Sequence, residues 1–488
     1  MKFEHRKRSG ESYGLVSRSS KLLARDDCVD ANPANTLTDR LNTLLNSSGP
    51  GYVLDLCPST QYLIQAPILF AAPDQEIRTL GEPFGDERAT LVVNGPVSNG
   101  VGHTTAVDGT CGNCNGVRLR HVQINGTRLG APPTGGGANI EMGGPNNGQL
   151  VEFVHSFDPR SWSCLHVAEG PFTCDNVTVQ NNDIGPAGSD QFQQWADGIS
   201  VSCQNSLVRN NTVNNPTDGG IVLFGSPGTV VENNTIFVET QTLLGGINMV
   251  DYEPWGGNYT NTIVRNNSIF GGFSTDTPTP GEEDGANQDD VIIKIGIAIG
   301  PRTWFGNQYG LNVSANGMVL NNQLSGAFGY GIAITSATNF TVSDNILVGN
   351  TSFIGASGPN CSSTATTPTP APFVIQQNNT LASSIQTNFT PIADGDGMTC
   401  ILPPDGGDFW PFGGNPANPI AGQSTSSSSG LSGGAKAGIA IGVIAGVILL
   451  AAAAWFIRKA ALARAKPKVM PWDRVGYVRN KEEVTPQT

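Results

Sequence analysis

Two aspartates near the middle of the sequence have the spacing of a catalytic pair. Asp197 begins the segment DGIS and Asp218 begins DGGIV, 21 residues further on. Two carboxyl groups held close together repel each other when both are ionised, so the pKa of one of them rises. A protonated acid beside an ionised base is the arrangement that hydrolyses glycosidic bonds. If the fold stacks the two segments on one face, these aspartates predict a glycoside hydrolase.

Both aspartates also have a structural interpretation. Asp-Gly is a common turn sequence, and an aspartate in front of a strand can accept hydrogen bonds from backbone N–H groups. Trp195, close to Asp197, can stack on a sugar ring or pack on the fold instead. Arg209 and Arg265 suit a polysaccharide lyase, in which a base removes a proton beside a sugar carboxylate, or are solvated surface charges. The residues alone leave these alternatives open.

The sequence predicts neither a cofactor nor a metal site. It contains no phosphate-binding loop and no Ser-His-Asp set. Four histidines between residues 28 and 400 do not have the spacing of metal ligands, and we interpret them as structural. They are His103, His121, His155 and His166.

A pair of asparagines between two apolar residues recurs along the chain. The pattern predicts stacked units, because self-similarity at 20 to 30 residues is typical of solenoids. Each copy has a partner segment with a Gly-Ile pair, as at Gly198 and Gly220, and the apolar residues alternate as in strands. The copies are VQNNDI (179–184), VRNNTV (208–213), VENNTI (231–236), VRNNSI (264–269), VLNNQL (319–324) and a decayed VSDNIL (342–347).

Alternation within each copy separates the two asparagines. In VRNNTV an inward Val208 places Asn210 outward and Asn211 inward. Inward amides on successive coils can bond to one another, which predicts an interior ladder. The alternative is that asparagine merely suits turns. The expected ladder consists of Asn182, Asn211, Asn234, Asn267, Asn322 and Asn345.

These repeats resemble those of the right-handed parallel β-helix superfamily, the pectin-lyase-like fold, from about residue 28 to 400. The resemblance implies an all-β solenoid. It also implies that an amphipathic helix near the start, with Leu37, Leu41, Leu44 and Leu45 on one side, plugs the open end of the stack.

Short motifs between residues 197 and 294 are similar to those of the polygalacturonase family of β-helix hydrolases. Asp197 matches the family's Asp-Gly-Ile motif, and Asp218 matches the first aspartate of its Asp-Asp-x-Ile motif, where Gly219 replaces the second. Gly245-Gly246-Ile247 stands where the family has Gly-His-Gly, and Lys294 is what remains of Arg-Ile-Lys. The resemblance implies that Asp197 and Asp218 are catalytic. Lys294 then joins Trp195 and Arg209 as expected substrate-binding residues.

The sequence predicts a membrane-anchored protein whose main part lies outside the cell. Residues 437–457 form 21 apolar residues without a charge, long enough to cross a bilayer, and Arg458 and Lys459 follow. By the positive-inside rule the tail is cytoplasmic and the preceding residues are outside. The expected parts are an N-terminal segment whose end resembles that of a pro-segment (1–27), a cap with the first coils (28–110), β-helix repeats (111–402), a Gly/Ser/Pro-rich stalk (403–434), a membrane helix (435–457) and a basic cytoplasmic tail (458–488).

Cysteines and glycosylation sequons agree with that location. Nine cysteines predict disulfides: Cys28 with Cys57, Cys361 with Cys400, Cys111 with Cys114, and one bridge among Cys164, Cys174 and Cys203. Asn-x-Ser/Thr sequons begin at the outward asparagines Asn210, Asn233 and Asn266, where N-glycans would fit.

The net charge of the chain limits the classes of ligand that we expect. The net charge of −13 excludes nucleic acid as the expected ligand and favours a neutral or branched glycan over a polyanion. Two classes of function follow from the sequence. The first is a membrane-anchored glycoside hydrolase acting on cell-wall or plant polysaccharide, with a polysaccharide lyase as a variant. The second is a non-catalytic glycan-binding or structural surface protein. The sequence does not indicate an oligomeric state.

Overall fold

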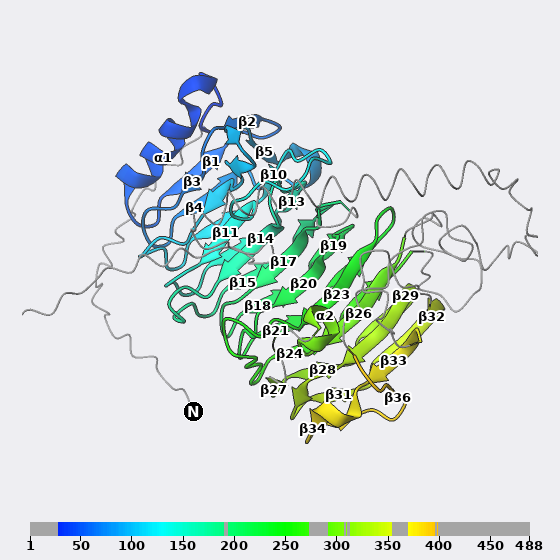
Figure 1. Cartoon of the computed structure of the whole chain (residues 1–488). Coiled ribbons are helices and arrows are strands. Elements are labelled where there is room, and N and C mark those ends of the chain that lie inside the picture. The colour runs from blue at the N-terminus through cyan, green and yellow to red at the C-terminus, as the bar shows by residue number, and fades with distance from the viewer. Residues whose placement is uncertain are drawn as a thin grey trace, which may run out of the picture.

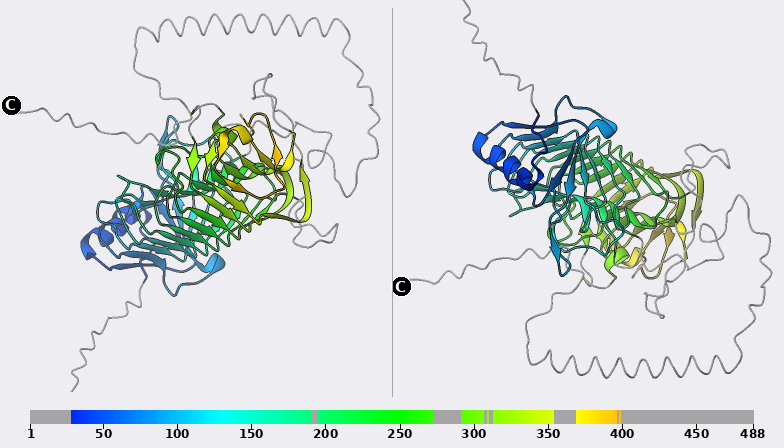
Figure 2. Two further views of the ribbon diagram at one scale, coloured as in Figure 1. Left: turned by 90° about the horizontal axis from the view of Figure 1, so that it is seen from below. Right: turned by 90° about the horizontal axis from the view of Figure 1, so that it is seen from above.

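Parallel strands wind into a stack of coils that is covered at its N-terminal end by a helix (Figure 1). The computed structural model describes residues 28–189, 194–272, 291–306, 309, 313–353, 369–395 and 398. Figure 2 shows the helix at one end of the stack and the last strands at the other. The strands form three faces, which we number in the order in which the chain visits them.

Face 1 is an 11-stranded parallel sheet. Its strands in spatial order are β1 (Val53–Leu56), β4 (Glu76–Thr79), β9 (Arg118–Arg120), β12 (Leu150–Glu152), β15 (Thr178–Gln180), β18 (Leu207–Arg209), β21 (Val230–Glu232), β24 (Ile263–Arg265), β28 (Met318–Leu320), β31 (Thr341–Ser343) and β35 (Ser384–Ile385).

Face 2 follows face 1 in each coil. Its strands are β2 (Gln61–Ile64), β5 (Ala89–Val93), β10 (Val122–Asn125), β13 (His155–Phe157), β16 (Asp183–Ile184), β19 (Thr212–Asn214), β22 (Thr235–Phe237), β25 (Ser268–Phe270), the first part of β29 (Gln323–Ile334) and β32 (Ile346–Phe353).

Face 3 completes each coil. Its strands are β3 (Ile68–Leu69), β8 (Val107–Asp108), β11 (Ile140–Gly143), β14 (Ser163–Ala168), β17 (Asp197–Val201), β20 (Gly219–Leu223), β23 (Leu243–Met249), β26 (Ile293–Ile299), the second part of β29, β33 (Ala371–Ile375) and β36 (Thr390–Pro391). The long strand β29 therefore joins faces 2 and 3 into one 20-stranded sheet.

Short elements complete the described part of the chain. They are the helix α2 (Arg302–Phe305), the 3-10 turns η1 (Ala34–Thr36), η2 (Gly85–Glu87) and η3 (Gln377–Asn379), the small sheet β27 (Ser314–Ala315), β30 (Ala337–Thr338) and β34 (Thr380–Leu381), and the antiparallel pair β6 (Val97–Ser98) and β7 (Val101–Gly102).

Helix α1 (Leu37–Ser48) is the expected plug. Leu37, Leu41 and Leu45 are buried against the first coil, while Leu44 is only partly buried. The side chain of Asn42 accepts a hydrogen bond from the Leu69 backbone N–H (2.8 Å) and donates one to a carbonyl of the same coil. The helix thus covers the core and also satisfies backbone groups of the first coil.

The paired asparagines have two separate roles, and the predicted ladder is confirmed. The Asn211 Oδ1 accepts hydrogen bonds from the backbone N–H (3.1 Å) and the Nδ2 (2.9 Å) of Asn182. Asn211 itself donates to the Oδ1 of Asn234 in the same way, and the pattern continues to Asn345. All of these amides are buried.

The first asparagine of each pair makes the bend between faces 1 and 2. Asn210 has a φ of 54°, Asn233 of 56° and Asn266 of 55°, and all three side chains are exposed. Asparagine tolerates this left-handed conformation better than most residues with a side chain. The candidate glycosylation sites therefore lie on the surface, at the same position of successive coils.

The glycines of the Gly-Ile pairs lie within strands of face 3, where the coils pack closely. A Cβ added to Gly220 would lie 2.5 Å from the carbonyl oxygen of Gly246 and 2.7 Å from Cγ2 of Ile236. Glycine is needed there because the neighbouring coil and a face 2 side chain occupy the space of a methyl group.

Three disulfides lie in the described residues. They join Cys28 to Cys57, Cys111 to Cys114, and Cys174 to Cys203. Cys164 is a buried free thiol, whose pKa is raised by burial. Cys361 and Cys400 lie outside the described residues.

Within the described ranges, none of the helices is long and apolar enough to cross a membrane. The N-terminal segment 1–27, the stalk 403–434, the apolar span 435–457 and the basic tail 458–488 all lie outside those ranges.

Candidate functional site

The two aspartates singled out in the sequence lie on adjacent coils of face 3. The register pairs Ile199 with Ile221, which places Asp197 level with Gly219 and Asp218 level with Ala196. The aspartates are therefore one coil and one strand residue apart. This offset is expected, because Asp197 is two residues before Ile199 in the sequence and Asp218 is three residues before Ile221.

Asp197 is held by hydrogen bonds beneath the surface. It has 0% of its area exposed, its Oδ1 accepts the Gly219 N–H at 2.9 Å, and its Oδ2 accepts the Ser200 hydroxyl at 2.9 Å. The Ser200 hydroxyl is also 3.0 Å from that of Ser163. Asp218 is partly exposed. The contacts of Asp197 are those of the structural interpretation, in which a strand-leading aspartate binds neighbouring backbone and hydroxyl groups.

The three expected substrate-binding residues are not gathered around this pair. Lys294 on β26 is level with Leu244, which is itself level with Asp218, so about 9.6 Å of stacking separates the lysine from Asp218. Lys294 is buried, and burial lowers its pKa to about 7. Trp195, two residues before Asp197, is partly exposed.

Arg209 is on β18 of face 1, not on face 3. Arg265 lies on the same face, two coils further on, and binds the Glu232 carboxylate through two nitrogens at 2.8 and 2.6 Å. A carboxylate already neutralises this second arginine, so the pair that suggested a lyase does not face a shared site with the aspartates.

A side-chain cluster on earlier coils of face 3 was not expected from the sequence. Glu141 on β11 and His166 on β14 are level with each other, and His166 Nδ1 lies 2.7 Å from Glu141 Oε2. The other carboxylate oxygen, Oε1, accepts the Ala138 N–H at 2.6 Å. The two side chains are 12% and 14% exposed, so they reach the surface while their orientation is fixed.

Trp162 completes this cluster, which we call the Glu141–His166 site. Its ring meets the His166 imidazole edge-on, with centroids 4.9 Å apart. The indole Nε1 is shielded and has no hydrogen-bond partner in the part of the chain that the structure describes. For His166, hydrogen bonding among the described residues involves Nδ1, and Nε2 remains available.

The charge around His166 is negative. Burial lowers the pKa of His166, but the Glu141 carboxylate acts against it through charge and hydrogen bonding, and Glu169 and Asp197 add to this effect. The net result is a pKa above the usual 6.5. The imidazole is level with Ser200 on the next coil, so the site and the Asp197 network are neighbours.

Face 3 changes character further along the stack. The row that contains Glu141, His166 and Ser200 continues through Val222 and Asn248 into Ala298 and Ala333. Beyond Asn248 the outer side is an apolar cluster that includes Ile295 and Tyr330 and is packed against Trp304. In this row the polar residues therefore extend from Asp108 on β8 to Asn248 on β23, with Val222 between Ser200 and Asn248.

Comparison with known proteins agrees with the coil topology. A family model described as "Right handed beta helix region" matches residues 170–283, and no curated protein matches the chain. The matched region and the parallel coils together show that the fold is a right-handed parallel β-helix. This is the class predicted from the asparagine and Gly-Ile repeats.

Solved structures with this kind of fold are distant. DFA-IIIase from Arthrobacter chlorophenolicus A6 in complex with DFA-III is 16% identical to this chain. The match covers 73% of this chain and 89% of the DFA-IIIase chain, with a TM-score of 0.44. A hyperthermoactive exopolygalacturonase from Thermotoga maritima is 16% identical, with coverage of 64% and 83% and a TM-score of 0.41. The surface adhesin PfbA of Streptococcus pneumoniae is 13% identical, with coverage of 65% and 88% and a TM-score of 0.36. Scores this low carry no inference about activity or ligand.

Proposed function

We propose that the protein is a cell-surface β-helix that binds a neutral polysaccharide at the Glu141–His166 site. The observation that carries the proposal is a pair of N–H groups beside one aromatic ring. Glu141 fixes the imidazole so that His166 Nε2 is left to a ligand, and the neighbouring Trp162 Nε1 has no partner among the described residues.

The chemistry of this site suits a sugar. Sugar hydroxyls accept hydrogen bonds from such N–H groups, and the apolar face of a sugar ring packs on an aromatic side chain. Glu141, Glu169 and Asp197 surround the imidazole with negative charge. An anionic glycan would be repelled there, which favours a neutral one.

Trp162 is the residue with which we test this proposal. The full-length protein in detergent micelles should bind at least one of cellulose, xylan and β-1,3-glucan in a sedimentation assay. Trp162→Ala should weaken that binding at least ~10-fold, about 1.4 kcal/mol. Trp162→Phe keeps an aromatic ring and loses the N–H, so its affinity should lie between those of the wild type and Trp162→Ala. Arg265→Gln, on face 1, is the matched control. Binding that is equal in all four proteins would contradict the proposal.

Binding should also depend on pH through His166. With Nδ1–H directed to Glu141, Nε2 carries a proton only in the imidazolium form, which exists below the folded-state pKa. Because that pKa is above 6.5, affinity should be full in mildly acidic buffer and fall as the pH rises through it. In His166→Gln the profile should be flat. The same falling profile in His166→Gln would assign the pH dependence to another group.

Hydrolysis by Asp197 and Asp218 is the second candidate. Their positions on adjacent coils support it, because inversion requires carboxyl groups ~6.5–9.5 Å apart. The buried, doubly bonded carboxylate of Asp197 weighs against it. A hydrolase incubated with cellulose, xylan and β-1,3-glucan would release reducing ends from at least one of them. Asp197→Asn and Asp218→Asn would each abolish the release. Cleavage that survives both substitutions would remove these residues from the mechanism.

Anchoring through residues 435–457 belongs to the same proposal. Its support is the uncharged span followed by Arg458 and Lys459. Protease added to intact cells should remove the β-helix and leave a small fragment with the tail. An antibody against residues 458–488 that stains unpermeabilised cells would refute this topology.

A further inference from the structure

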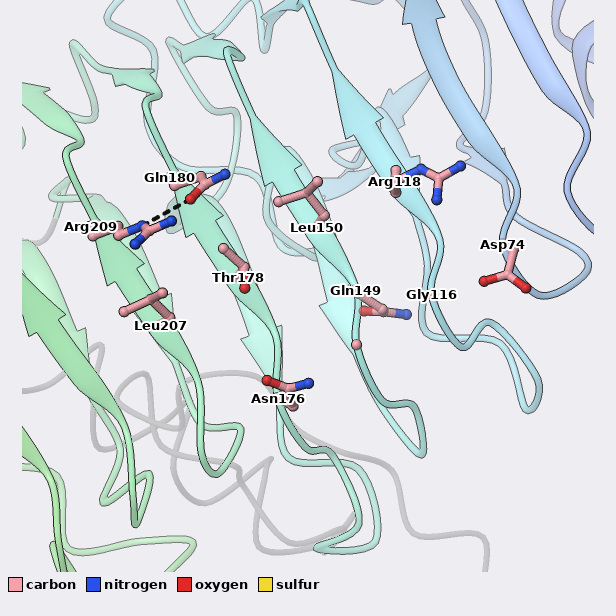
Figure 3. A pocket seen from close by; sticks show the side chains of 11 residues that line it. Asp74, Gly116, Arg118, Gln149, Leu150, Asn176, Thr178, Gln180, Leu207 and Arg209 are labelled. Carbon is pink, nitrogen blue, oxygen red and sulfur yellow. Dashed lines mark hydrogen bonds between the residues drawn. The ribbon is translucent and has the colours of Figure 1, made fainter. Parts of the chain in front are cut away.

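A groove crosses several coils of face 1, whereas the neutral-glycan site is on face 3. Figure 3 shows Leu150, Thr178 and Leu207 on neighbouring strands, with Arg118 toward one end of the groove and Arg209 toward the other. Asp74 and Asn176 come from the turns that lead into the strands. The floor is made of short or uncharged side chains, and charged groups are found near its ends.

The two arginines of this groove are held by one nitrogen each. Arg118 Nε donates to Glu76 Oε2 at 2.7 Å, and Arg209 Nε donates to the Gln180 side-chain oxygen at 2.9 Å. Neither terminal nitrogen of these guanidinium groups has a hydrogen-bond partner among the described residues. Each side chain is therefore fixed in direction while its outer fork remains available to a ligand.

Other arginines of face 1 differ in this respect. Arg120 binds Glu152 through Nε and approaches Glu76 and Glu82 through Nη1. Arg265 gives both Nε and Nη2 to Glu232. The contrast between Arg209 and Arg265 is informative because they are at the same position of coils two apart. Arg120 and Arg265 thus bind carboxylates through two nitrogens each, whereas Arg118 pairs with Glu76 through one. Arg209 bonds to the neutral Gln180 side chain, although Glu232 lies level with it on the next coil.

The separation of the two forks defines the shape of a ligand that reaches both. Arg118 is level with Leu150, Thr178 and Leu207, so three coil spacings lie between β9 and β18. At ~4.8 Å per coil this is about 14 Å along the axis, and Arg209 lies two residues, or ~7 Å, further along its strand. The Cα atoms of the two arginines are thus about 16 Å apart. A single small anion cannot contact both, whereas an extended polymer can.

The available groups define the chemistry of that polymer. Arginine forks pair with carboxylate and sulfate groups through charge-assisted, bidentate hydrogen bonds. Thr178 and Asn176 offer groups that bond to hydroxyls. A peptide would need an unpaired strand edge or an apolar anchoring pocket. The strands under the groove are paired on both sides, so this surface offers no such edge.

We propose that the face 1 groove binds an extended acidic polysaccharide, with its anionic groups on Arg118 and Arg209. This site is separate from the Glu141–His166 site of the proposed function, and the ligand has the opposite charge requirement. The acid groups can be carboxylates or sulfates, because both fit the guanidinium fork. The chain as a whole has a net charge of −13, so binding depends on these two local cations and not on the overall field.

The test uses full-length protein in detergent micelles, produced without N-glycans because Asn176 begins an Asn-Val-Thr sequon. The probes are oligogalacturonate and dextran sulfate, with carboxyl-reduced oligogalacturonate and plain dextran as their uncharged counterparts. Binding is measured by isothermal titration calorimetry at two salt concentrations. We expect binding of at least one charged probe, weaker at the higher salt, and at least tenfold weaker binding of its uncharged counterpart.

The variants separate the groove from the rest of face 1. Arg118→Gln and Arg209→Gln should each weaken binding of the charged probe about tenfold, and the double variant should abolish it. Arg265→Gln, whose guanidinium is already paired, should bind as the wild type does. Arg209→Lys keeps the charge without the fork and should lose part of the affinity. Thermal midpoints identify any variant that fails to fold, and Arg209→Lys then stands in for Arg209→Gln.

Three results would overturn the proposal: binding of neither charged probe, equal binding of charged and uncharged probes, or equal losses in Arg209→Gln and Arg265→Gln. Trp162→Ala distinguishes this site from the proposed function. It should leave binding of the acidic probes unchanged while it weakens binding of neutral polysaccharide. Loss of both ligands in Trp162→Ala would mean that the two surfaces are one site, which would also overturn the proposal.

Discussion

Asn211→Leu should lower the free energy of unfolding by roughly 2–6 kcal/mol. The amide of Asn211 donates to the Val179 carbonyl at 3.0 Å and accepts from the N–H and side chain of Asn182. Leucine would leave at least the Val179 carbonyl and the Asn182 N–H without these bonds in a buried place. Each stranded group costs ~1–3 kcal/mol, and leucine supplies no compensating contact of the same shape.

Asn210→Gly is the matched control for that substitution. Asn210 is exposed and has a φ of 54°, a conformation that glycine adopts without strain. Its effect should be a small fraction of that of Asn211→Leu. Denaturant unfolding of both proteins, followed by tryptophan fluorescence after removal of N-glycans, makes the comparison. Equal losses would show that the inward amides do not carry the stability assigned to the ladder.

Gly220→Ala should also destabilise strongly, by about 2–4 kcal/mol. The new Cβ would lie 2.5 Å from a backbone oxygen of Gly246, which cannot turn aside as the end of a side chain can. The two coils would have to separate locally, and the paired strands β20 and β23 would lose contact.

Gly112→Ala provides the control for Gly220→Ala. Gly112 is exposed and has no atom within 4 Å of the position of an added Cβ. Its substitution should be nearly neutral, whereas Gly220→Ala should lower the midpoint of thermal unfolding by several degrees. A midpoint for Gly220→Ala close to that of Gly112→Ala would contradict the close contact between coils.

The sequence contained enough information for the repeating part of the fold. Alternation assigned Asn210 outward and Asn211 inward because strand side chains have a period of two residues. The Gly-Ile pairs gave the coil register, and with it the one-residue offset between Asp197 and Asp218. These inferences worked because the same short-range constraint acts on every coil.

The Glu141–His166 contact could not be found in this way. The two residues are 25 positions apart in sequence, and the chain between them leaves face 3 through β12 and β13 before it returns. A signal existed, since each is a polar residue between two buried apolar ones, in Ile140-Glu141-Met142 and Leu165-His166-Val167. That pattern marks a residue on the outer side of a strand but does not say which coils pair.

The different hydrogen-bond partners of Arg209 and Arg265 could not be predicted from the sequence either. Both follow an apolar residue and precede an asparagine pair, so their local sequences are almost the same. What separates them is the neighbour on the preceding coil, Gln180 for Arg209 and Glu232 for Arg265; Glu232 is also level with Arg209, on the following coil, but binds Arg265. Whether an outward arginine is neutralised therefore depends on register across coils and not on its own motif.

The ladder of buried amides has a direction. Each asparagine accepts from the preceding coil and donates to the following one, from Asn182 onward to Asn345, where the side chain of Gln386 receives the last bonds. Aligned amide dipoles polarise one another, so the row strengthens as it lengthens. A unit inserted by gene duplication would join such a row without altering any existing link, provided that it brought one asparagine at the same place. Proteins of this design can therefore grow or shrink by whole coils during evolution. Successive asparagines of the row are already 23 to 55 residues apart, so residues added in the loops of a coil leave the row intact.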